Sequence, residues 1–478
     1  MSEIEVIALA ILGLAICFSN WRTGVVVCMV AGFLLDPIRK TVPGQPVYMT
    51  GFVGVFLLAT AGSAMSRGVR PSFRAIHQWN KSLRLPMRLF FILVVVESGI
   101  TLARTGSLAL AAIGLIAYFA PLPAILLGYN YVRSRQDAAN FLKLYVMLTL
   151  VMISGIYLSL AGYDWKILSQ VGEGLYAFAP TGEQLNLLSG FFRAPEVAAW
   201  HAATSICALI LLFMVIKGQK SIKWVASMML PFLVVALIFT GRRKFAVEIA
   251  LFAVLYVSLL TVFQTSAIKS VLVLVAGIFL TFGAYTYLIP PEATDRAVPY
   301  YDRTTTVQGE GSSRLMEFTV DAFEYVVAQN GVFGVGAGMG SQGSQYYGGG
   351  GTVVGGNAEG GIGKVLAELG VPGFLLLSWL AIGLARYSWS IVALTRGKDP
   401  LVSRLAFGLI SLAVVNVFVF AAGGQAFGDP FILIVLGFML GFLFAVPKML
   451  VAGNEARQTL GRPRTWERAR LVPNLGTE

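Results

Sequence analysis

Long apolar runs alternate with short polar connections along most of this chain. Several runs have roughly the 17 to 24 residues that a helix needs to cross a membrane. The first two runs are short and can form one distorted pair, so the pattern predicts an all-α polytopic transmembrane helix bundle of about 12–13 spans. The expected spans are Ile4–Phe18, Gly24–Leu35, Val47–Met65, Leu89–Leu102, Leu108–Tyr129, Phe141–Ala161, Val197–Ile216, Trp224–Thr240, Phe245–Phe263, Ser270–Ile289, Val365–Leu384, Leu405–Ala422 and Phe431–Val446.

One polar stretch, Pro290–Lys364, interrupts this pattern and predicts a long loop. After Arg314, apolar residues recur at helical spacing, which predicts an amphipathic helix that either lies in the membrane interface or covers the bundle. Ser312 or Ser313 is a suitable N-cap, and Asn330-Gly331 is a suitable left-handed stop. The apolar positions are Met316, Val320, Phe323 and Val327.

Glycine dominates the second half of this loop, with 15 glycines between Gly331 and Gly363. Because glycine is costly to order, the run predicts either a mobile lid over a substrate groove or backbone nests for phosphate. No GxxxxGK[ST] sequence occurs here, which argues against a nucleotide loop. The chain thus divides into ten helices in residues 1–289, the loop 290–364, the last helices in 365–448 and a basic tail 449–478.

Basic residues in the short connections set the orientation. Counting one span at a time places five clusters on the same side, which the positive-inside rule makes cytoplasmic. Three other connections, Gly162–Glu196, Gly241–Lys244 and Pro290–Lys364, then face outward. The five clusters are Arg67–Arg88, Arg133 with Arg135, Lys217–Lys223, Arg396 with Lys398, and the tail after Lys448.

Composition narrows the class further. Of 478 residues, 56% are hydrophobic and 13% charged, and the mean hydropathy is +0.75, which favours a membrane protein. The net charge of +12 comes mostly from the basic connections, so no nucleic-acid partner is expected. Cys17, Cys28 and Cys207 fall in apolar runs and imply no disulfide. Two histidines and three dispersed cysteines also form no metal site.

The GRRK connection runs against the orientation rule. Arg242, Arg243 and Lys244 follow a span of about one bilayer crossing whose other end carries Lys223, so both ends cannot be cytoplasmic. These cations either anchor to lipid headgroups or form an anion site at the outer surface. Arginine forks match phosphate oxygens and would hold a diphosphate. The other outer connections supply three more arginines, Arg193, Arg303 and Arg314.

Acidic residues and one histidine accompany these cations. Glu196 and Glu359 are candidates for a general base on an acceptor hydroxyl. His201 is a third candidate, although a buried histidine with ordinary hydrogen bonds is the commoner outcome. Glu248 and Glu368 are expected to orient the arginines.

Together, these outer residues resemble the O-antigen ligase and polymerase superfamily of bacterial envelope glycan assembly, from Leu188 to Gly373. GFFRAPEVAAW resembles its first outer motif, and TGRRKFAVEIALF its T-x-S-R-G hairpin, with Arg243 at the arginine position. GSSRLMEFTVDAFEYVVAQNGVFGVGAGMG resembles its Arg-led interfacial helix, and AELGVPG the start of its next span, with Glu368 at the acidic position. The family carries His-Asn where this chain has Glu359-Gly360.

The resemblance implies a metal-independent, inverting glycosyl transfer without a cofactor, at the periplasmic face of the bacterial inner membrane. The substrate would be an undecaprenyl-diphosphate-linked glycan, polymerised or ligated in surface or exopolysaccharide synthesis. Membrane lipid and other polysaccharide assembly proteins are the further expected partners. Since Glu359 replaces the family histidine, either Glu359 is the base, or Glu196 or His201 serves, or the protein does not perform this reaction.

Two hypotheses from other classes stay open. A transporter or flippase for a lipid-linked sugar or another anion would use Glu97, Glu248 and the arginines as its pathway, with the glycine run as a gate. The absence of an internal repeat argues against this class. A non-catalytic partner of a polysaccharide export complex would suit a chain that has lost the base at Glu359.

Overall fold

A computed structural model describes residues 3–69, 73–74, 76, 81–171, 176–178, 182, 184–216, 220–264, 268–283, 298–303, 322–341 and 360–460. Within these residues, ten helical segments are long and apolar enough to cross a membrane. The other three expected spans correspond to the helices α1, α10 and α12. The chain is therefore a multi-pass membrane protein with an α-helical bundle, as the apolar runs predict.

Helices account for nearly all of the described secondary structure. They are α1 (Glu3–Ser19), α2 (Trp21–Thr41), α3 (Phe52–Ser66), α5 (Arg84–Thr105), α6 (Leu108–Phe119), α7 (Pro121–Tyr131), α8 (Arg135–Leu160), α9 (Pro195–Val215), α10 (Lys220–Phe239), α11 (Arg243–Phe263), α12 (Ile268–Gly283), α16 (Ala322–Asn330), α18 (Gly361–Thr395), α19 (Pro400–Ala422) and α20 (Pro430–Leu460).

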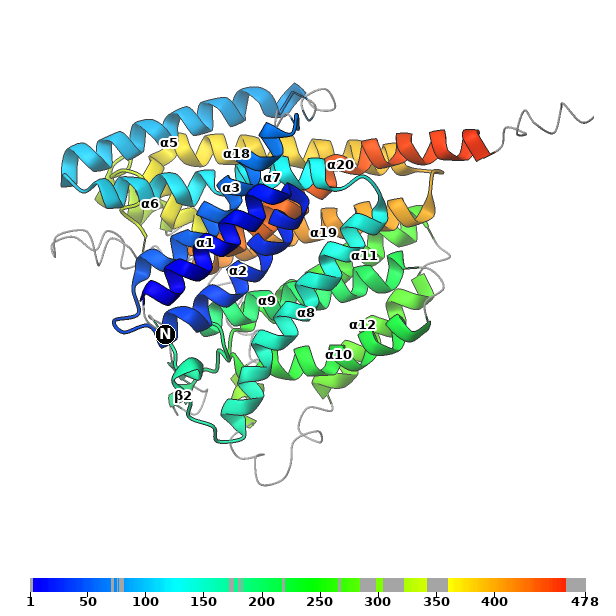
Figure 1. The fold of residues 1–478 in the computed structure, drawn as a ribbon, viewed down its shortest axis with the longest axis horizontal. Coiled ribbons are helices and arrows are strands. Elements are labelled where there is room, and N and C mark those ends of the chain that lie inside the picture. Colours follow the sequence, from blue (N-terminus) through cyan, green and yellow to red (C-terminus); the bar gives the residue numbers. More distant parts are fainter. Residues whose placement is uncertain are drawn as a thin grey trace, which may run out of the picture.

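The helix α9 lies at the centre of the bundle. Figure 1 shows it among α8, α11 and α19, and these helices pack against it. Small residues such as Ala198 and Ala202 allow this close approach, and nearly every side chain of α9 is buried. Trp200 donates its indole N–H to Asn416 Oδ1 of α19 at 2.9 Å, which satisfies both groups inside the bundle. The first turn of α9 carries part of the candidate site, so this packing fixes the site.

The all-helical expectation misses one short hairpin in the connection before α9. Its strands are β1 (Tyr176–Phe178) and β2 (Gln184–Asn186), paired antiparallel. Buried side chains of the hairpin pack together with Tyr300, so this connection meets the segment 298–303. Strands of three residues hold too few alternating positions to be predicted from a pattern.

Two expected spans are broken rather than continuous. The run Leu108–Tyr129 forms two helices, because Pro121 begins α7 directly after α6 ends. Inside α18, Gly370 has φ 64° and ψ −167°, and two helical pieces meet there. A Cβ at Gly370 would lie 2.3 Å from the Val332 carbonyl oxygen, so only glycine allows this approach.

The first part of the glycine run, Gly331–Ser341, packs between α5 and α18. Val335 donates its N–H to the Ala367 carbonyl of α18 at 2.8 Å, and Ala337 donates its N–H to the Glu97 carbonyl of α5 at 3.3 Å. This part is a fixed backbone connection between helices, unlike the mobile lid expected for the whole run. The remainder, 342–359, lies outside the described residues.

The amphipathic helix predicted before this segment ends where the sequence indicates. α16 stops at Asn330, and Gly331 has φ 76° with its N–H bonded to the Val327 carbonyl at 2.9 Å. Val326 is buried against α18, so the described part of this helix covers the bundle. The earlier part of the predicted helix, with Arg314, lies outside the described residues.

Replacing Gly338 with alanine is expected to lower the free energy of unfolding by about 2–3 kcal/mol. Gly338 has φ 93°, and a Cβ there would lie 2.3 Å from the Leu110 carbonyl oxygen of α6. Gly331→Ala is the matched control, because Gly331 is also left-handed but a Cβ there meets nothing within 4 Å. Thermal unfolding of both purified variants measures the difference. Equal losses would show that the segment does not pack on α6 as described.

Candidate functional site

Arg193 fixes the connection before α9 to two other helices. Its Nη2 lies 3.0 Å from Asp429 Oδ2 at the start of α20, and its backbone N–H donates to Asp36 Oδ2 of α2 at 3.0 Å. Burial disfavours the charged guanidinium, but the carboxylates of Asp429 and Asp36 more than compensate and raise the pKa of Arg193. Arg193, predicted to bind a diphosphate, is thus engaged in an internal ion pair.

Lys40 strengthens the same anchor from α2. Its side chain is fully buried and donates to the carbonyls of Phe192 at 2.6 Å and Gly190 at 3.1 Å. Gly190 has φ 59°, and a Cβ there would lie 2.8 Å from the Met152 carbonyl oxygen of α8. The loop that carries Arg193 is therefore held tightly between α2, α8 and α20.

Glu196, in the first turn of α9, pairs with two cations of the GRRK connection. Arg242 Nε lies 3.1 Å from Glu196 Oε2, and Lys244 Nζ pairs with Oε1. Lys244 also donates to the Gly423 carbonyl, at the end of α19, at 3.1 Å. Among the described side chains, the Glu196 carboxylate pairs with two cations, Arg242 and Lys244, so these three side chains together carry a net positive charge. The geometry shows Glu196 as a counter-ion, and its role as a base stays a prediction.

Residues 298–303 bring part of the third predicted outer connection to the same place. Arg303 Nε donates to the Gly241 carbonyl at 3.2 Å, and the Tyr300 hydroxyl donates to the Asn186 carbonyl. Gly241 has φ 63° where α10 turns into the GRRK sequence. Parts of all three connections that the sequence places on one side thus meet in the structure. Arg303 supports the backbone of the turn there.

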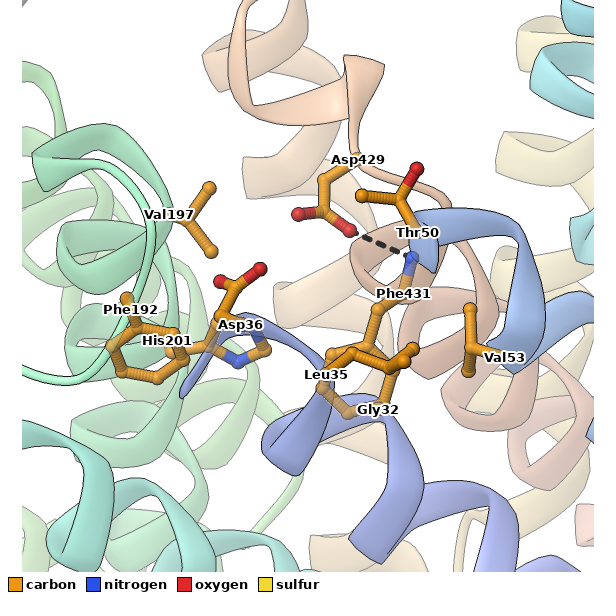
Figure 2. Close-up of a pocket in the computed structure, with 10 residues that line it drawn as sticks. All are labelled: Gly32, Leu35, Asp36, Thr50, Val53, Phe192, Val197, His201, Asp429 and Phe431. Atoms are coloured by element: carbon orange, nitrogen blue, oxygen red, sulfur yellow. Dashed lines mark hydrogen bonds between the residues drawn. The ribbon is translucent and has the colours of Figure 1, made fainter. Parts of the chain in front are cut away.

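A pocket lies beside the pair of Arg193 and Asp429. Figure 2 shows the carboxylates of Asp36 and Asp429 on its wall, with His201 and Phe192 on the side of α9. The pocket is small and open to solvent, with room for little more than a water molecule. Asp429 Oδ1 accepts the Phe431 N–H at 2.8 Å, so this carboxylate also caps α20.

His201 lies deeper in the bundle and is fully buried. Its Nδ1 is 2.9 Å from the Tyr145 hydroxyl of α8, and its ring stacks on Phe192 with 4.9 Å between centroids. Nε2 has no hydrogen-bond partner within the described ranges. This is the buried, hydrogen-bonded histidine that the sequence also allows, and its role as a base stays a prediction.

The two carboxylates expected to orient arginines bind other groups. Glu248 is fully buried on α11 and accepts a hydrogen bond from Thr204 of α9 at 3.3 Å. Glu368 accepts from the Tyr118 hydroxyl of α6 at 2.6 Å and from the Gly340 N–H at 3.0 Å. Glu368 therefore orients the backbone of the glycine segment.

Of the three remaining predicted site residues, the structure describes Arg243 but not Arg314 or Glu359. Arg243 begins α11 beside Arg242 and is half-buried. Arg314 and Glu359, the diphosphate ligand and the base expected from the long loop, lie outside the described residues. Their roles stay predictions.

Three charged residues of the site, Asp36, Lys40 and Asp429, are not among those that the sequence predicts. All three lie at the edge of apolar runs, where a charge is easily taken as the boundary of a span. The available signal was aspartate before proline, at Asp36-Pro37 and Asp429-Pro430. Asp429 fits the pattern of a helix start, whereas Asp36 lies inside α2, where a charge needs a partner.

Comparison with known proteins assigns no family to this chain. No protein-family model matches it, and no curated protein matches it significantly. The charged group and the sequence motifs are therefore the basis for a function.

Proposed function

We propose that this protein transfers a glycan from an undecaprenyl-diphosphate-linked saccharide to an acceptor hydroxyl at the periplasmic face of the bacterial inner membrane. It would act as a polymerase or ligase in surface or exopolysaccharide synthesis. The observation that carries the proposal is the meeting of three connections in one positively charged group, formed by Glu196, Arg242, Lys244 and the Arg303 segment. A lipid-linked diphosphate keeps its tail in the membrane and its anion at this surface, so the two are complementary.

Arg242 and Arg243 are the proposed contacts to the diphosphate oxygens. Both lie at the start of α11, where the positive end of the helix dipole favours an anion. Arg193 and Arg303 hold the surrounding loops, so we assign them a positioning role. Arg314 would add a contact from the long loop.

The proposed reaction forms a bond between the acceptor oxygen and the anomeric carbon of the donor. The bond from that carbon to the diphosphate oxygen breaks, and undecaprenyl diphosphate leaves. A base takes the proton of the acceptor hydroxyl, with Glu359, Glu196 and His201 as candidates. The cations stabilise the negative charge that develops on the leaving diphosphate.

Replacing Arg243 with alanine is expected to reduce polymer formation by about 100-fold, because one charged contact to the leaving group is lost. The readout is the amount and length of envelope polysaccharide in a deletion strain that carries the variant at wild-type membrane levels. Arg396→Ala, an exposed cation at the end of α18, is the control and should leave the polymer unchanged. Wild-type polymer from the Arg243 variant would refute the diphosphate contact.

A further inference from the structure

A second group of cations lies at the start of α2, far along that helix from Asp36, and in the second half of α20, far from Asp429. It consists of Arg22 at the start of α2, Arg133 in the turn between α7 and α8, and Lys448 on α20. Along α2 and α20, it lies about 20–30 Å from Asp36 and Asp429, at 1.5 Å per residue. The two groups are therefore about one membrane thickness apart.

Aromatic rings surround two of these cations. The guanidinium carbon of Arg22 is 4.8 Å from the ring centroid of Tyr131 and 5.6 Å from that of Trp21. Lys448 Nζ lies 4.8 Å from the ring centroid of Tyr129 and donates to the Tyr129 carbonyl at 2.8 Å. Trp and Tyr are the residues typical of membrane–water interfaces. The group therefore has the composition of a site at the headgroup level.

Its positive charge is incompletely balanced. Asp137 Oδ1 lies 3.5 Å from Arg22 Nη2, a long ion pair, while its Oδ2 accepts the backbone N–H groups of Arg133 and Ser134. Arg22 Nη1 is buried and has no hydrogen-bond partner in the described part of the chain. Arg133 is exposed, and both arginines act electrostatically on Lys448. Among the described residues, these three cations thus share one carboxylate, that of Asp137, which already caps α8.

The backbone adds to this charge. α2 and α8 both begin here, and the pair of Arg22 and Asp137 joins their first turns. The first turn of each helix is capped, α2 by Asn20 and α8 by Ser134 and Asp137, so the backbone contributes the partial positive charge of two helix dipoles, which favours an anion. Figure 1 shows the turn between α7 and α8 beside α20, which carries Lys448.

We propose that this group binds the phosphate of an anionic phospholipid headgroup. A lipid is favoured over a soluble phosphate because the exposed face of α8 turns apolar beyond Asn140. Met147 and Val151 are 52% and 61% exposed there and offer a surface for the acyl chains. The site lies away from the proposed diphosphate contacts and does not depend on them.

The test compares wild-type protein with the double variant Arg22→Gln, Arg133→Gln in detergent, with added dioleoylphosphatidylglycerol. A thiol-reactive dye follows unfolding, because Cys17, Cys28 and Cys207 are all buried in the folded protein. We expect phosphatidylglycerol, and not phosphatidylcholine, to raise the Tm of the wild type by about 3 °C or more. The double variant should need about 30-fold more lipid for the same rise, since each cation near an anionic lipid contributes on the order of 1 kcal/mol.

The control is the double variant Arg396→Gln, Lys398→Gln, which removes the same charge from the exposed end of α18 and should respond like the wild type. An equal response of wild type and the Arg22 and Arg133 variant would overturn the site, as would equal stabilisation by phosphatidylcholine. If inorganic phosphate at matched ionic strength stabilises the wild type as much as phosphatidylglycerol does, the lipid assignment is wrong. If the double variant does not fold, the exposed Arg133→Gln change alone serves, with native mass spectrometry counting retained phosphatidylglycerol. Equal retention by wild type and this variant would also overturn the site.

Discussion

Replacing Asp429 with alanine is expected to lower the free energy of unfolding by about 3–5 kcal/mol. The change removes the carboxylate that pairs with Arg193 at 3.0 Å, and it removes the cap that accepts the Phe431 N–H. The side chains of Arg193 and Asp429 are only 16% and 10% exposed, so water replaces little of the lost contact. The buried guanidinium of Arg193 would lose its main counter-ion. An uncompensated buried charge costs more free energy than the loss of both partners together.

Two further variants separate the parts of this effect. In Asp429→Asn the amide oxygen can still cap α20. The free energy of unfolding of this variant should therefore be about 1 kcal/mol higher than that of Asp429→Ala. Combining Asp429→Ala with Arg193→Ala should cost less than the two single changes added together, because no unpaired guanidinium remains. Thermal unfolding, followed through the buried cysteines, compares the wild type with four variants: Asp429→Ala, Asp429→Asn, Arg193→Ala and the double change. Additive losses in the double variant would contradict the pairing of Arg193 with Asp429.

The helices of this protein could be predicted because hydropathy, length and caps are local properties. The long apolar runs correspond to helices, with Leu108–Tyr129 forming two, and the stop at Asn330-Gly331 is observed as expected. The hydropathy pattern does not predict where a helix is interrupted inside an apolar run. Pro121 divides one expected span because proline suits the first turn of a helix, whereas Gly370 bends another because the backbone at Val332 packs against it.

The partners of the charged residues could not be predicted. Counting spans placed Arg193, Glu196 and Arg242 on one side, and the structure brings Glu196 and Arg242 into contact. The carboxylates that engage Arg193 come from α2 and α20, which are distant in sequence. An arginine is available to a ligand only to the extent that such partners leave charge unbalanced, and this depends on packing rather than on sequence spacing.

The glycine run shows the same limit. Glycine is costly to order by itself, which led to the prediction of a lid. In the structure, Gly338 lies so close to the Leu110 carbonyl that a side chain would not fit, and Gly340 donates its N–H to Glu368. Glycine is required there for backbone packing against helices, and only the neighbouring helices reveal this reason.

Replacing Glu196 with glutamine is expected to lower the free energy of unfolding by about 3 kcal/mol. This is the lower limit of the loss that is typical when one partner of a buried ion pair is removed. The lower limit applies because the Arg242 and Lys244 side chains are 19% and 21% exposed and keep some water. The size of the residue is preserved, so the loss reports the missing charge between two cations. The same change leaves a larger positive excess at the start of α11.

The excess positive charge in Glu196→Gln allows a test with an added anion, whose result would differ if the ion pair were purely structural. If Arg242 and Lys244 belong to an anion site, inorganic pyrophosphate should raise the Tm of Glu196→Gln more than that of the wild type, because the added anion replaces the lost carboxylate. Glu324→Gln, an exposed change of the same type on α16, should respond like the wild type. Chloride at matched ionic strength corrects for screening. Equal pyrophosphate shifts in all three proteins would contradict a part for Arg242 and Lys244 in holding a diphosphate.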